Sequence, residues 1–230
     1  MLKLSGESLS GDETLGIDPV ALTAAAGEIV QVLRLGVQLG IVIGGGNFVR
    51  ARDMQGDPII QRITADYMGM LGTVMNALAL RDALEARGRA ARVLSAIPMA
   101  AICETFTRPA ALEHLEAGRA VIFAAGTGCP FFTTDTTAAL RAGEIGAELI
   151  LKATKVDGVF DSDPVMNPSA TRYDRLTYQK ALEQRLGVMD MAAFSLCRES
   201  RIPIIVCDFF RSGNLARAVR GEEVGTRITE

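Results

Sequence analysis

The chain is poor in the side chains that carry most proton-transfer chemistry. Its 230 residues include one histidine, no tryptophan and three tyrosines. Any Ser-His-Asp or Cys-His mechanism would have to use His114, whose neighbours predict an ordinary solvated helix. The scarcity of histidine therefore favours a reaction in which little proton shuttling is needed.

Cysteine is also scarce, and its spacing excludes the common zinc and redox motifs. We expect the thiols to be reduced, as in a cytosolic protein, and we predict no protein-bound metal centre. The four cysteines are scattered, without CxxC or Cys/His spacing, at Cys103, Cys129, Cys197 and Cys207.

Strong charge and long apolar runs are absent as well. The net charge of −3 excludes a general affinity for nucleic acid or anionic membranes, although positive charge can still be concentrated at one site. The longest apolar stretch, near residues 68–80, is interrupted by Asn76 and is too short to span a bilayer. A polar Ser-Gly-Glu sequence follows Leu4 directly, so we expect no signal peptide and a cytoplasmic location.

What the chain does have is an alternation of apolar runs and amphipathic stretches, which is typical of an α/β fold. Hydrophobic residues make up 49% and charged residues 22%, which is enough for a sizeable core. There is no internal repeat or long linker, so we predict one domain with a mainly parallel sheet. Strands are expected at residues 1–4, 38–43, 91–94, 120–124, 149–153 and 204–207, with an edge strand at 226–229.

Helices are expected after Pro19, from 64 to 86, and at 134–142, 181–186, 191–199 and 214–220. The second of these is indicated by side chains at three- and four-residue spacing, which places them on one helix face. They are Thr64, Met68, Leu71, Met75 and Leu78.

The first segment with chemical content is a lysine at the end of the first predicted strand. Lys3 is followed by Leu4, Ser5 and Gly6. Its ammonium group and the N–H groups of the turn can therefore face phosphates together. The simpler alternative is a strand-end lysine in a surface turn.

A run of three glycines follows the second buried strand. Gly44, Gly45 and Gly46 let the backbone approach a ligand closely and present N–H groups to an anion. The run is neither a Walker A loop, because no Gly-Lys-Ser/Thr ends it, nor a Rossmann GxGxxG sequence. Arg50 and Arg52 lie just beyond it and could neutralise phosphate. An ordinary tight turn is the alternative.

The most specific segment runs from residue 126 to residue 135. Small residues and a proline form a turn after a strand, and two phenylalanines precede a helix start. Thr133 or Thr134 can cap that helix and bind phosphate at its positive end. The phenylalanines could wall a flat base or belong to the core. Asp135 could orient the lysine or be no more than a helix-start acid.

Another polar segment follows a later strand. Lys152, Thr154 and Lys155 precede a turn rich in aspartates. This arrangement suits adenine and ribose contacts and, through water, Mg²⁺. The alternative is an Asp-Gly turn followed by a solvated Asp-Pro turn. The order of the four segments predicts two substrates that enter one cleft above the strand ends of a single sheet.

In this order, the segments together resemble the amino-acid kinase superfamily and, within it, the bacterial UMP kinase family. The likeness covers nearly the whole chain. It rests on residues 3–7, 42–47, 126–135 and 152–160, and it continues through 68–71, 95–98, 189–190 and 225–228.

The resemblance implies a three-layer αβα sandwich around a mainly parallel sheet, formed as one amino-acid kinase domain over residues 1–230. Its N-terminal part would mainly bind UMP and form the oligomer, and the part from residue 150 would mainly bind ATP. The implied reaction is ATP + UMP → ADP + UDP with Mg²⁺, a step of de novo pyrimidine nucleotide (CTP) biosynthesis. Bacterial members of the family are cytoplasmic homohexamers that GTP activates and UTP inhibits, so we expect the same here, with neither nucleic acid nor a membrane as partner.

The resemblance also assigns roles to individual residues. Lys3, Arg50 and Asp135 would be catalytic, with Asp135 organising the lysine. Because the UMP phosphate is already ionised near neutral pH, alignment and charge neutralisation would suffice without a general base. The implied ATP contacts are Lys3, Leu4, Ser5, Gly6, Gly46, Arg50, Thr154, Phe160 and Asp163. The implied UMP contacts are Gly45, Asp66, Thr127, Gly128, Cys129, Pro130, Phe131, Phe132, Thr133 and Thr134.

The sequence leaves several points open. Only Met1 and Leu2 precede Lys3, whereas family members carry a longer first strand, so we expect a weaker hold on the lysine. Residues 11–16 resemble the GTP-effector region only loosely. Either Lys152 or Lys155 could face the phosphates.

Two other functions compete with this interpretation. One is a superfamily enzyme that phosphorylates a carboxylate or carbamate, but the 126–135 segment and Asp66 suit a nucleotide better. The other is a nucleotide-binding sensor without catalysis, which only the short N-terminus supports. Activity with UMP, and its loss on changing Lys3, would separate the three.

Overall fold

The computed structural model describes residues 1–11, 15–50, 59–164, 166–167, 169–184 and 186–230. Arg52, one of the two arginines predicted to neutralise phosphate, lies outside these residues. So does the middle of the predicted effector segment at 11–16. The residues predicted to bind ATP and UMP all lie within them.

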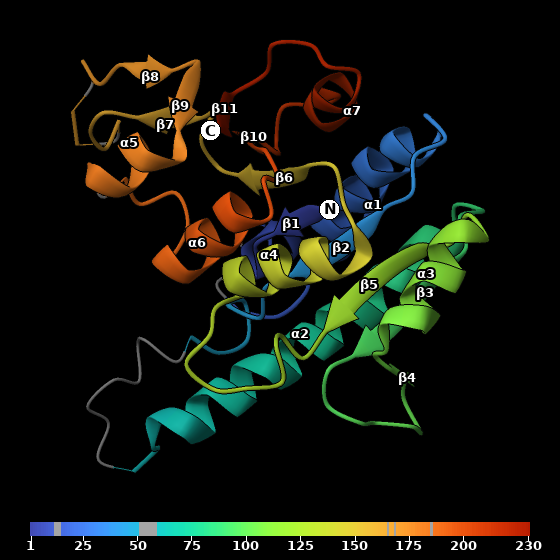
Figure 1. The fold of residues 1–230 in the computed structure, drawn as a ribbon. Coiled ribbons are helices and arrows are strands. Elements are labelled where there is room, and N and C mark those ends of the chain that lie inside the picture. Colours follow the sequence, from blue (N-terminus) through green and yellow to red (C-terminus); the bar gives the residue numbers. More distant parts are fainter. Residues whose placement is uncertain (12–14, 51–58, 165, 168, 185) are drawn as a thin grey trace.

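Within the described residues the chain forms a nine-stranded sheet in the order β4-β3-β5-β2-β1-β6-β10-β11-β9 (Figure 1). All neighbouring strands are parallel except β10 and β11. A separate antiparallel pair is formed by β7 (Val159–Phe160) and β8 (Arg172–Tyr173). The strands of the main sheet are β1 Leu2–Leu4, β2 Gly40–Ile43, β3 Ala91–Ser95, β4 Glu104–Thr105, β5 Ala120–Ala124, β6 Ile150–Thr154, β9 Arg175–Thr177, β10 Ile204–Asp208 and β11 Thr226–Thr229.

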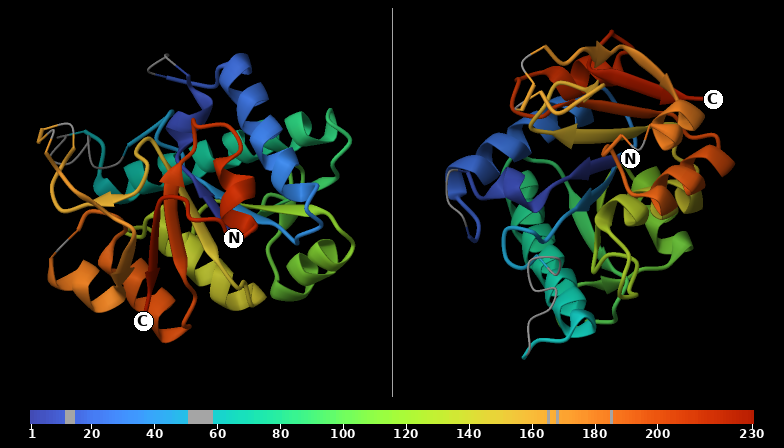
Figure 2. Two further views of the ribbon diagram at one scale, coloured as in Figure 1. Left: turned by 90° about the horizontal axis from the view of Figure 1, so that it is seen from above. Right: turned by 90° about the vertical axis from the view of Figure 1, so that its left-hand side faces the viewer.

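Helices cover both faces of this sheet, which gives the predicted three layers (Figures 1 and 2). One apolar core joins the sheet to α1, α2 and α7, and a second joins it to α3, α4, α5 and α6. Parallel strands bury both faces, so both need such a cover. The helices are α1 Pro19–Leu33, α2 Arg62–Glu85, α3 Arg108–Glu116, α4 Thr134–Ile145, α5 Tyr178–Glu183, α6 Met191–Glu199 and α7 Asn214–Val219, and a 3₁₀ turn, η1, spans Gly6–Leu9.

The pleat of the central strands decides which side chains fill the core and which serve the site. In β1, Leu2 and Leu4 are fully buried in the core formed with α1, α2 and α7. Lys3, between them, faces the other side of the sheet and meets α4. In β6, Leu151 belongs to the first core and Lys152 again faces α4. Successive strand residues point to opposite faces, so each strand places one lysine on the α4 side.

The long predicted helix is confirmed as α2, but its apolar stripe faces outward. Leu71 and Met75 are 48% and 44% exposed. The buried face combines core residues such as Leu80 with small and polar residues, among them Thr73 and Asn76. We call the exposed side chains Ile63, Tyr67, Leu71 and Met75 the outer stripe of α2.

One strand differs from expectation in its neighbours, and one helix differs in where it begins. The strand Thr226–Thr229 is not an edge, because it pairs with β10 on one side and with β9 on the other. The helix expected at 181–186 begins earlier, at Tyr178, because the Thr177 hydroxyl accepts the Lys180 N–H and caps it there. The elements β4, β7, β8, β9 and η1 were not predicted, since strands and turns this short carry little periodicity.

His114 does not lie on a solvated face. It is 8% exposed on α3, and its Nε2 lies 2.9 Å from Glu104 Oε2. Ala111 and Leu115 share its buried side of the helix, because residues three and four apart lie on one face. The only histidine of the chain is therefore a structural residue of the α3 layer.

The remaining sequence expectations concern membranes and thiols. None of the described helices combines the length and the apolar character that crossing a bilayer requires. All four cysteines are free thiols. Burial raises the pKa of Cys197 and of Cys207 to about 12, so both stay protonated and unreactive at neutral pH.

Gly225 provides a test of how β10 and β11 are joined. Its φ is +66°, and a methyl group there would collide with the carbonyl oxygen of Val206 on β10. Gly221 has a φ of +83°, but a methyl group there would meet nothing within 4 Å. The two glycines therefore share the backbone strain and differ only in the collision.

We expect Gly225→Ala to lower the free energy of unfolding by about 3 kcal/mol or more, because overpacking against backbone adds to left-handed strain. The control Gly221→Ala should cost about 1 kcal/mol, which is the strain alone. Urea denaturation followed by circular dichroism measures both. Equal losses for the two variants would contradict this packing.

Candidate active site

The centre of the site is a pair of lysines on neighbouring strands. Lys3 on β1 lies directly opposite Lys152 on β6 in the parallel register. Both ammonium groups reach the same carboxylate, that of Asp135 on α4. The Lys3 Nζ–Asp135 Oδ1 distance is 2.8 Å and the Lys152 Nζ–Asp135 Oδ2 distance is 2.7 Å. The three side chains are between 11% and 14% exposed.

Asp135 is placed there by the start of α4. The Thr133 hydroxyl accepts the N–H groups of Asp135 and Thr136 and so caps the helix, as predicted. Thr133 in turn donates to Asp190, which caps α6. Asp190 also accepts the Thr136 hydroxyl at 2.9 Å. The carboxylate between the lysines is thus anchored through two helix starts, and Asp135 is more than a helix-start acid.

Burial and charge act in opposite directions on this cluster. Burial alone would raise the pKa of Asp135, but the ammonium groups of Lys3 and Lys152 outweigh it and hold that pKa below 3.8. Burial lowers the pKa of Lys152 from 10.5, and the nearby Lys3 charge adds to this, although Asp135 acts against both. One carboxylate facing two ammonium groups leaves an excess positive charge directed at the cleft, which suits a phosphate.

The two lysines left open by the sequence are separated by the fold. Lys152 contacts Asp135 and the Val188 carbonyl, inside the site. Lys155 is 62% exposed and lies 3.6 Å from Glu7. Glu7 also pairs with Arg50, so a single carboxylate from η1 links one cation after β2 with one after β6. Glu7 ends the 3–7 motif, but no role was predicted for it, because both of its partners are distant in the chain.

The glycine turn lies against the same strand ends. The Gly44 N–H donates to the Leu4 carbonyl at 2.9 Å. Glycine is required at Gly45, because a methyl group there would collide with the carbonyl oxygen of Gly69 on α2. A methyl group at Gly6 would collide with Asn47 in the same way. Leu4 itself is fully buried, so only its backbone is available to a ligand.

Two buried amides fix this turn to α2. Asn76 donates to the Gly44 carbonyl and to Asn47 Oδ1, both at 2.7 Å. Asn47 donates to the Gly16 carbonyl at 2.7 Å and to Asn76 Oδ1 at 3.0 Å. All four amide N–H donors therefore have partners, as buried polar groups require. Asn76, which the sequence offered only as an interruption of an apolar run, holds the glycine turn in place.

The predicted UMP segment forms the opposite wall of a small cleft. Phe131 and Phe132 are 63% and 54% exposed, so they are not core residues. The Phe131 N–H donates to Asp66 Oδ2 at 3.0 Å, which ties the segment to α2. A cleft of about 130 Å³ lies between this segment, α2 and the glycine turn. Its lining includes the predicted residues Gly45, Gly46, Asp66, Thr127, Cys129, Phe132, Thr133 and Thr134.

The predicted ATP segment follows β6, beside the lysines. The Thr154 hydroxyl donates to the Val156 carbonyl at 2.6 Å and closes the turn after the strand. Phe160 is half-buried on β7, and Asp163 is exposed in the turn that follows. The 126–135 segment and the segment from Thr154 therefore both follow the carboxyl ends of parallel strands, β5 and β6. Their roles as nucleotide-binding segments stay predictions.

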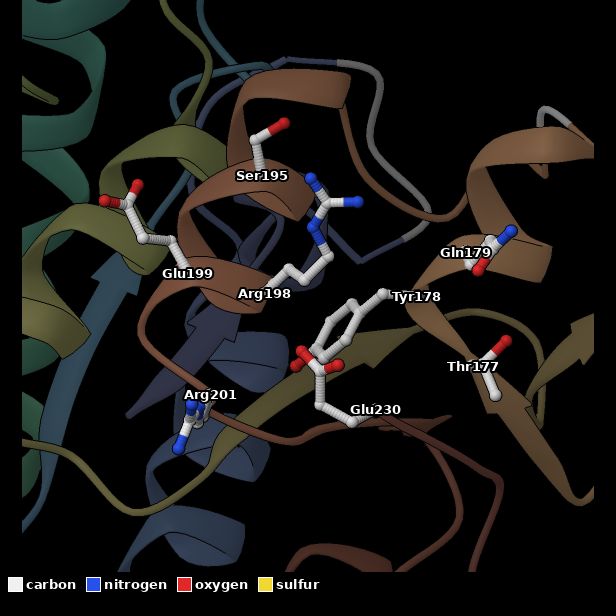
Figure 3. Close-up of a pocket in the computed structure, with 8 residues that line it drawn as sticks. All are labelled: Thr177, Tyr178, Gln179, Ser195, Arg198, Glu199, Arg201 and Glu230. Atoms are coloured by element: carbon white, nitrogen blue, oxygen red, sulfur yellow. The ribbon is translucent and has the colours of Figure 1, made fainter.

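A further depression, of about 960 Å³, lies elsewhere and shares no residue with the predicted site (Figure 3). It is lined at the end of α6 and the start of α5 by Arg198, Arg201, Tyr178 and the terminal Glu230. Arg201 lies three residues before β10 begins at Ile204, so this hollow is near the amino end of that strand, away from the carboxyl ends where the predicted site residues lie.

The fold and the site together define a class of protein. The described residues place a glycine turn and a capped helix start around a cleft, and the same helix start carries the carboxylate that pairs with two lysines. This arrangement suits the binding and transfer of phosphoryl groups without a histidine. A sequence model of the amino acid kinase family matches residues 1–208. The chain belongs to the amino acid kinase family.

Individual relatives sharpen this assignment. The chain is 54% identical over 228 residues to a uridylate kinase from Methylococcus capsulatus, covering 99% of this chain and 95% of that one. It is similar to the crystal structure of a UMP kinase from Bacillus anthracis, with a TM-score of 0.95 and 40% identity over 99% of this chain and 94% of that chain. A UMP kinase structure from Ureaplasma parvum gives 0.93 and 34%, over 100% and 97% of the two chains.

The charge balance at Asp135 predicts a pH-dependent contribution to stability. Its folded pKa is held below 3.8, so its contribution is complete above 3.8 and is lost as pH falls through the folded value. At neutral pH we expect Asp135→Asn to lower the free energy of unfolding by about 3–5 kcal/mol, because two buried ammonium groups lose their partner.

The difference between the native protein and Asp135→Asn should shrink as pH falls below 3.8. Urea denaturation at a series of pH values measures it. The matched control is Asp174→Asn, whose carboxylate is 85% exposed beside Arg172 and should contribute little at any pH. A difference for Asp135→Asn that stays constant through the acid range would contradict the charge balance.

Proposed function

We propose that the lysine cluster transfers the γ-phosphoryl group of ATP to UMP. The protein is a UMP kinase, a nucleoside monophosphate kinase that forms UDP and ADP in pyrimidine nucleotide biosynthesis. The observation that carries the residue-level proposal is the shared carboxylate: Asp135 holds Lys3 and Lys152 side by side. Asp135 lies in the first turn of α4, and the start of that helix lines the acceptor cleft together with the glycine turn.

Each part of the site has a role in this reaction. Lys3 and Lys152 neutralise the charge that develops on the transferring phosphoryl group, and Asp135 fixes their positions. Arg50 pairs with Glu7, and this ion pair holds its guanidinium beside the glycine turn, where it can donate hydrogen bonds to a phosphate. The acceptor enters against Gly45, Asp66 and the 126–134 segment, and ATP enters against Thr154, Phe160 and Asp163. No proton shuttle is needed, so the reaction does not require His114, which has a structural role.

Mg²⁺ is proposed to arrive with ATP. In the described part of the chain, no three His, Cys, Asp or Glu side chains form a cluster that could hold a metal ion. Asp135 is already paired with both lysines, and Glu7 is paired with Arg50. This donor set suits a Mg²⁺ ion held mainly by phosphate oxygens and water, which is how this ion usually binds in kinases. When bound, the ion neutralises phosphate charge.

The site also bears on the two competing functions. A carboxylate or carbamate acceptor has no base to stack and no ribose, whereas Phe131 and Phe132 are exposed beside Asp66 at the cleft. A sensor without catalysis would not need two buried lysines on one carboxylate, because burying these charges costs desolvation free energy. Although β1 is short, Lys3 is 11% exposed and paired, so the strand still presents it to the site.

We also propose how the protein assembles and is regulated. The outer stripe of α2 exposes four apolar side chains at four-residue spacing, which supports contact with a second copy of the chain and, by family resemblance, a homohexamer. Activation by GTP and inhibition by UTP are proposed from the resemblance alone. The four free thiols support the cytoplasm as the location.

The function is tested with ATP, Mg²⁺ and a panel of acceptors in a coupled assay for ADP. UMP should be phosphorylated faster than CMP or acetylglutamate by orders of magnitude. Lys3→Met should lower kcat by about a thousandfold or more while ATP and UMP still bind, because the lost charge acts mainly in the transition state.

The matched control is Lys180→Met, since Lys180 lies over the Tyr173 ring outside the cleft and should keep normal kcat. Equal rates with all acceptors would refute the UMP assignment. Full activity in Lys3→Met would refute the role of Lys3 while leaving the acceptor assignment intact.

A further inference from the structure

The segment that closes the acceptor cleft has an unusual backbone at both ends. Ala125, directly after β5, has a φ of +59°, and Gly126 has the same value. Phe131, near the other end, has a φ of +71°. Only three residues other than glycine have a positive φ in the described parts of the chain, and two of them bracket this segment. A side chain disfavours this conformation, so something must hold it.

Side chains of α2 hold both strained residues. The Ala125 N–H donates to Thr73 Oγ1 at 2.8 Å, in a fully buried hydrogen bond. The Phe131 N–H donates to Asp66 Oδ2 at 3.0 Å. Asp66 and Thr73 are seven residues apart, which is about two helical turns, so they lie on the same side of α2. The helix therefore fixes the segment at two points (Figure 1).

The Thr73 hydroxyl is fully used in this arrangement. It donates to the Met70 carbonyl at 2.7 Å while it accepts from Ala125. Thr73 is 2% exposed and lines the acceptor cleft. Without this oxygen, the buried Ala125 N–H would have no acceptor, and the left-handed conformation would lose its main restraint.

The same turn of α2 also meets the glycine turn. A methyl group at Gly45 would lie 3.0 Å from the Thr73 backbone nitrogen. Thr73 therefore stands where the two walls of the cleft come together. A shift of Ala125 relative to this point would change the width of the cleft that receives the acceptor.

We propose that Thr73 is a positioning residue for the acceptor: its hydroxyl holds the left-handed turn at Ala125 and Gly126 and thereby sets the acceptor segment at the correct distance from the glycine turn. This inference rests on the proposed function, because it assigns the acceptor to this cleft. Thr73 does not touch the reacting atoms in this role, and it acts through the backbone of residues 125–131.

The test replaces the hydroxyl by a methyl group of similar size. Thr73→Val should raise the KM for UMP about tenfold or more, which is the loss expected when a buried N–H loses its acceptor, and should leave the KM for ATP within about twofold. Thr73→Ser keeps the hydroxyl and should restore the UMP KM. Val74→Ala is the structural control, because Val74 is a buried core residue of the same helix. It should lower the melting temperature without changing the UMP KM.

Amide hydrogen exchange gives a second measurement that needs no turnover. The Ala125 amide should exchange slowly in the native protein and in Thr73→Ser. It should exchange much faster in Thr73→Val or Thr73→Ala, while the amides of α2 remain protected. If Thr73→Val does not fold, Thr73→Ala provides the same comparison without added bulk.

The outcomes separate the two proposals. A Thr73→Val enzyme with native KM values, or a Thr73→Ser enzyme as impaired as Thr73→Val, would overturn the positioning role. So would a matching rise of the UMP KM in Val74→Ala, because the effect would then be one of general stability. Absence of UMP phosphorylation by the native protein would refute the proposed function instead, and the exchange measurement would still decide whether Thr73 holds Ala125.

Discussion

The site depends on the register between two short strands. Because β1 and β6 pair so that Lys3 lies opposite Lys152, two ammonium groups meet on one face of the sheet. Like charges in a poorly solvated place repel each other, and the Asp135 carboxylate between them offsets this. The capped start of α4 holds that carboxylate, and α6 is tied to it through Asp190. A bound phosphate would neutralise the remaining positive charge of the two lysines. The unliganded site is therefore already arranged to bind a phosphate.

Helix α2 provides the second constraint, because it sets the distance between the two walls of the cleft. Its buried face carries small and polar residues where it meets the glycine turn, which lets that turn approach closely. Asn76 fixes that turn, and Asp66 fixes the opposite segment. The outer stripe of α2 is exposed on the opposite side of the same helix.

Much of the fold could be predicted, and the exceptions have physical reasons. The strand at Ala120–Ala124 and the helix at Met191–Glu199 appear with the expected bounds, because long apolar runs and strong periodicity dominate local structure. Periodicity cannot tell which of two possible faces will be buried, so the outward stripe of α2 and the buried His114 were not foreseen. The strand at Thr226–Thr229 was recognised but not its neighbours, since a partner far along the chain determines whether a strand is an edge.

By itself the sequence determined the family, the motifs and the absence of histidine chemistry, because these depend on which residues occur and in what order. Only the tertiary structure decided which of Lys152 and Lys155 serves the site, that Glu7 links Arg50 to Lys155, and that Thr73 and Asn76 hold the cleft walls. The physical reason is the same in each case. A hydrogen bond or ion pair between residues dozens of positions apart depends on strand register and helix packing, and no local pattern records either.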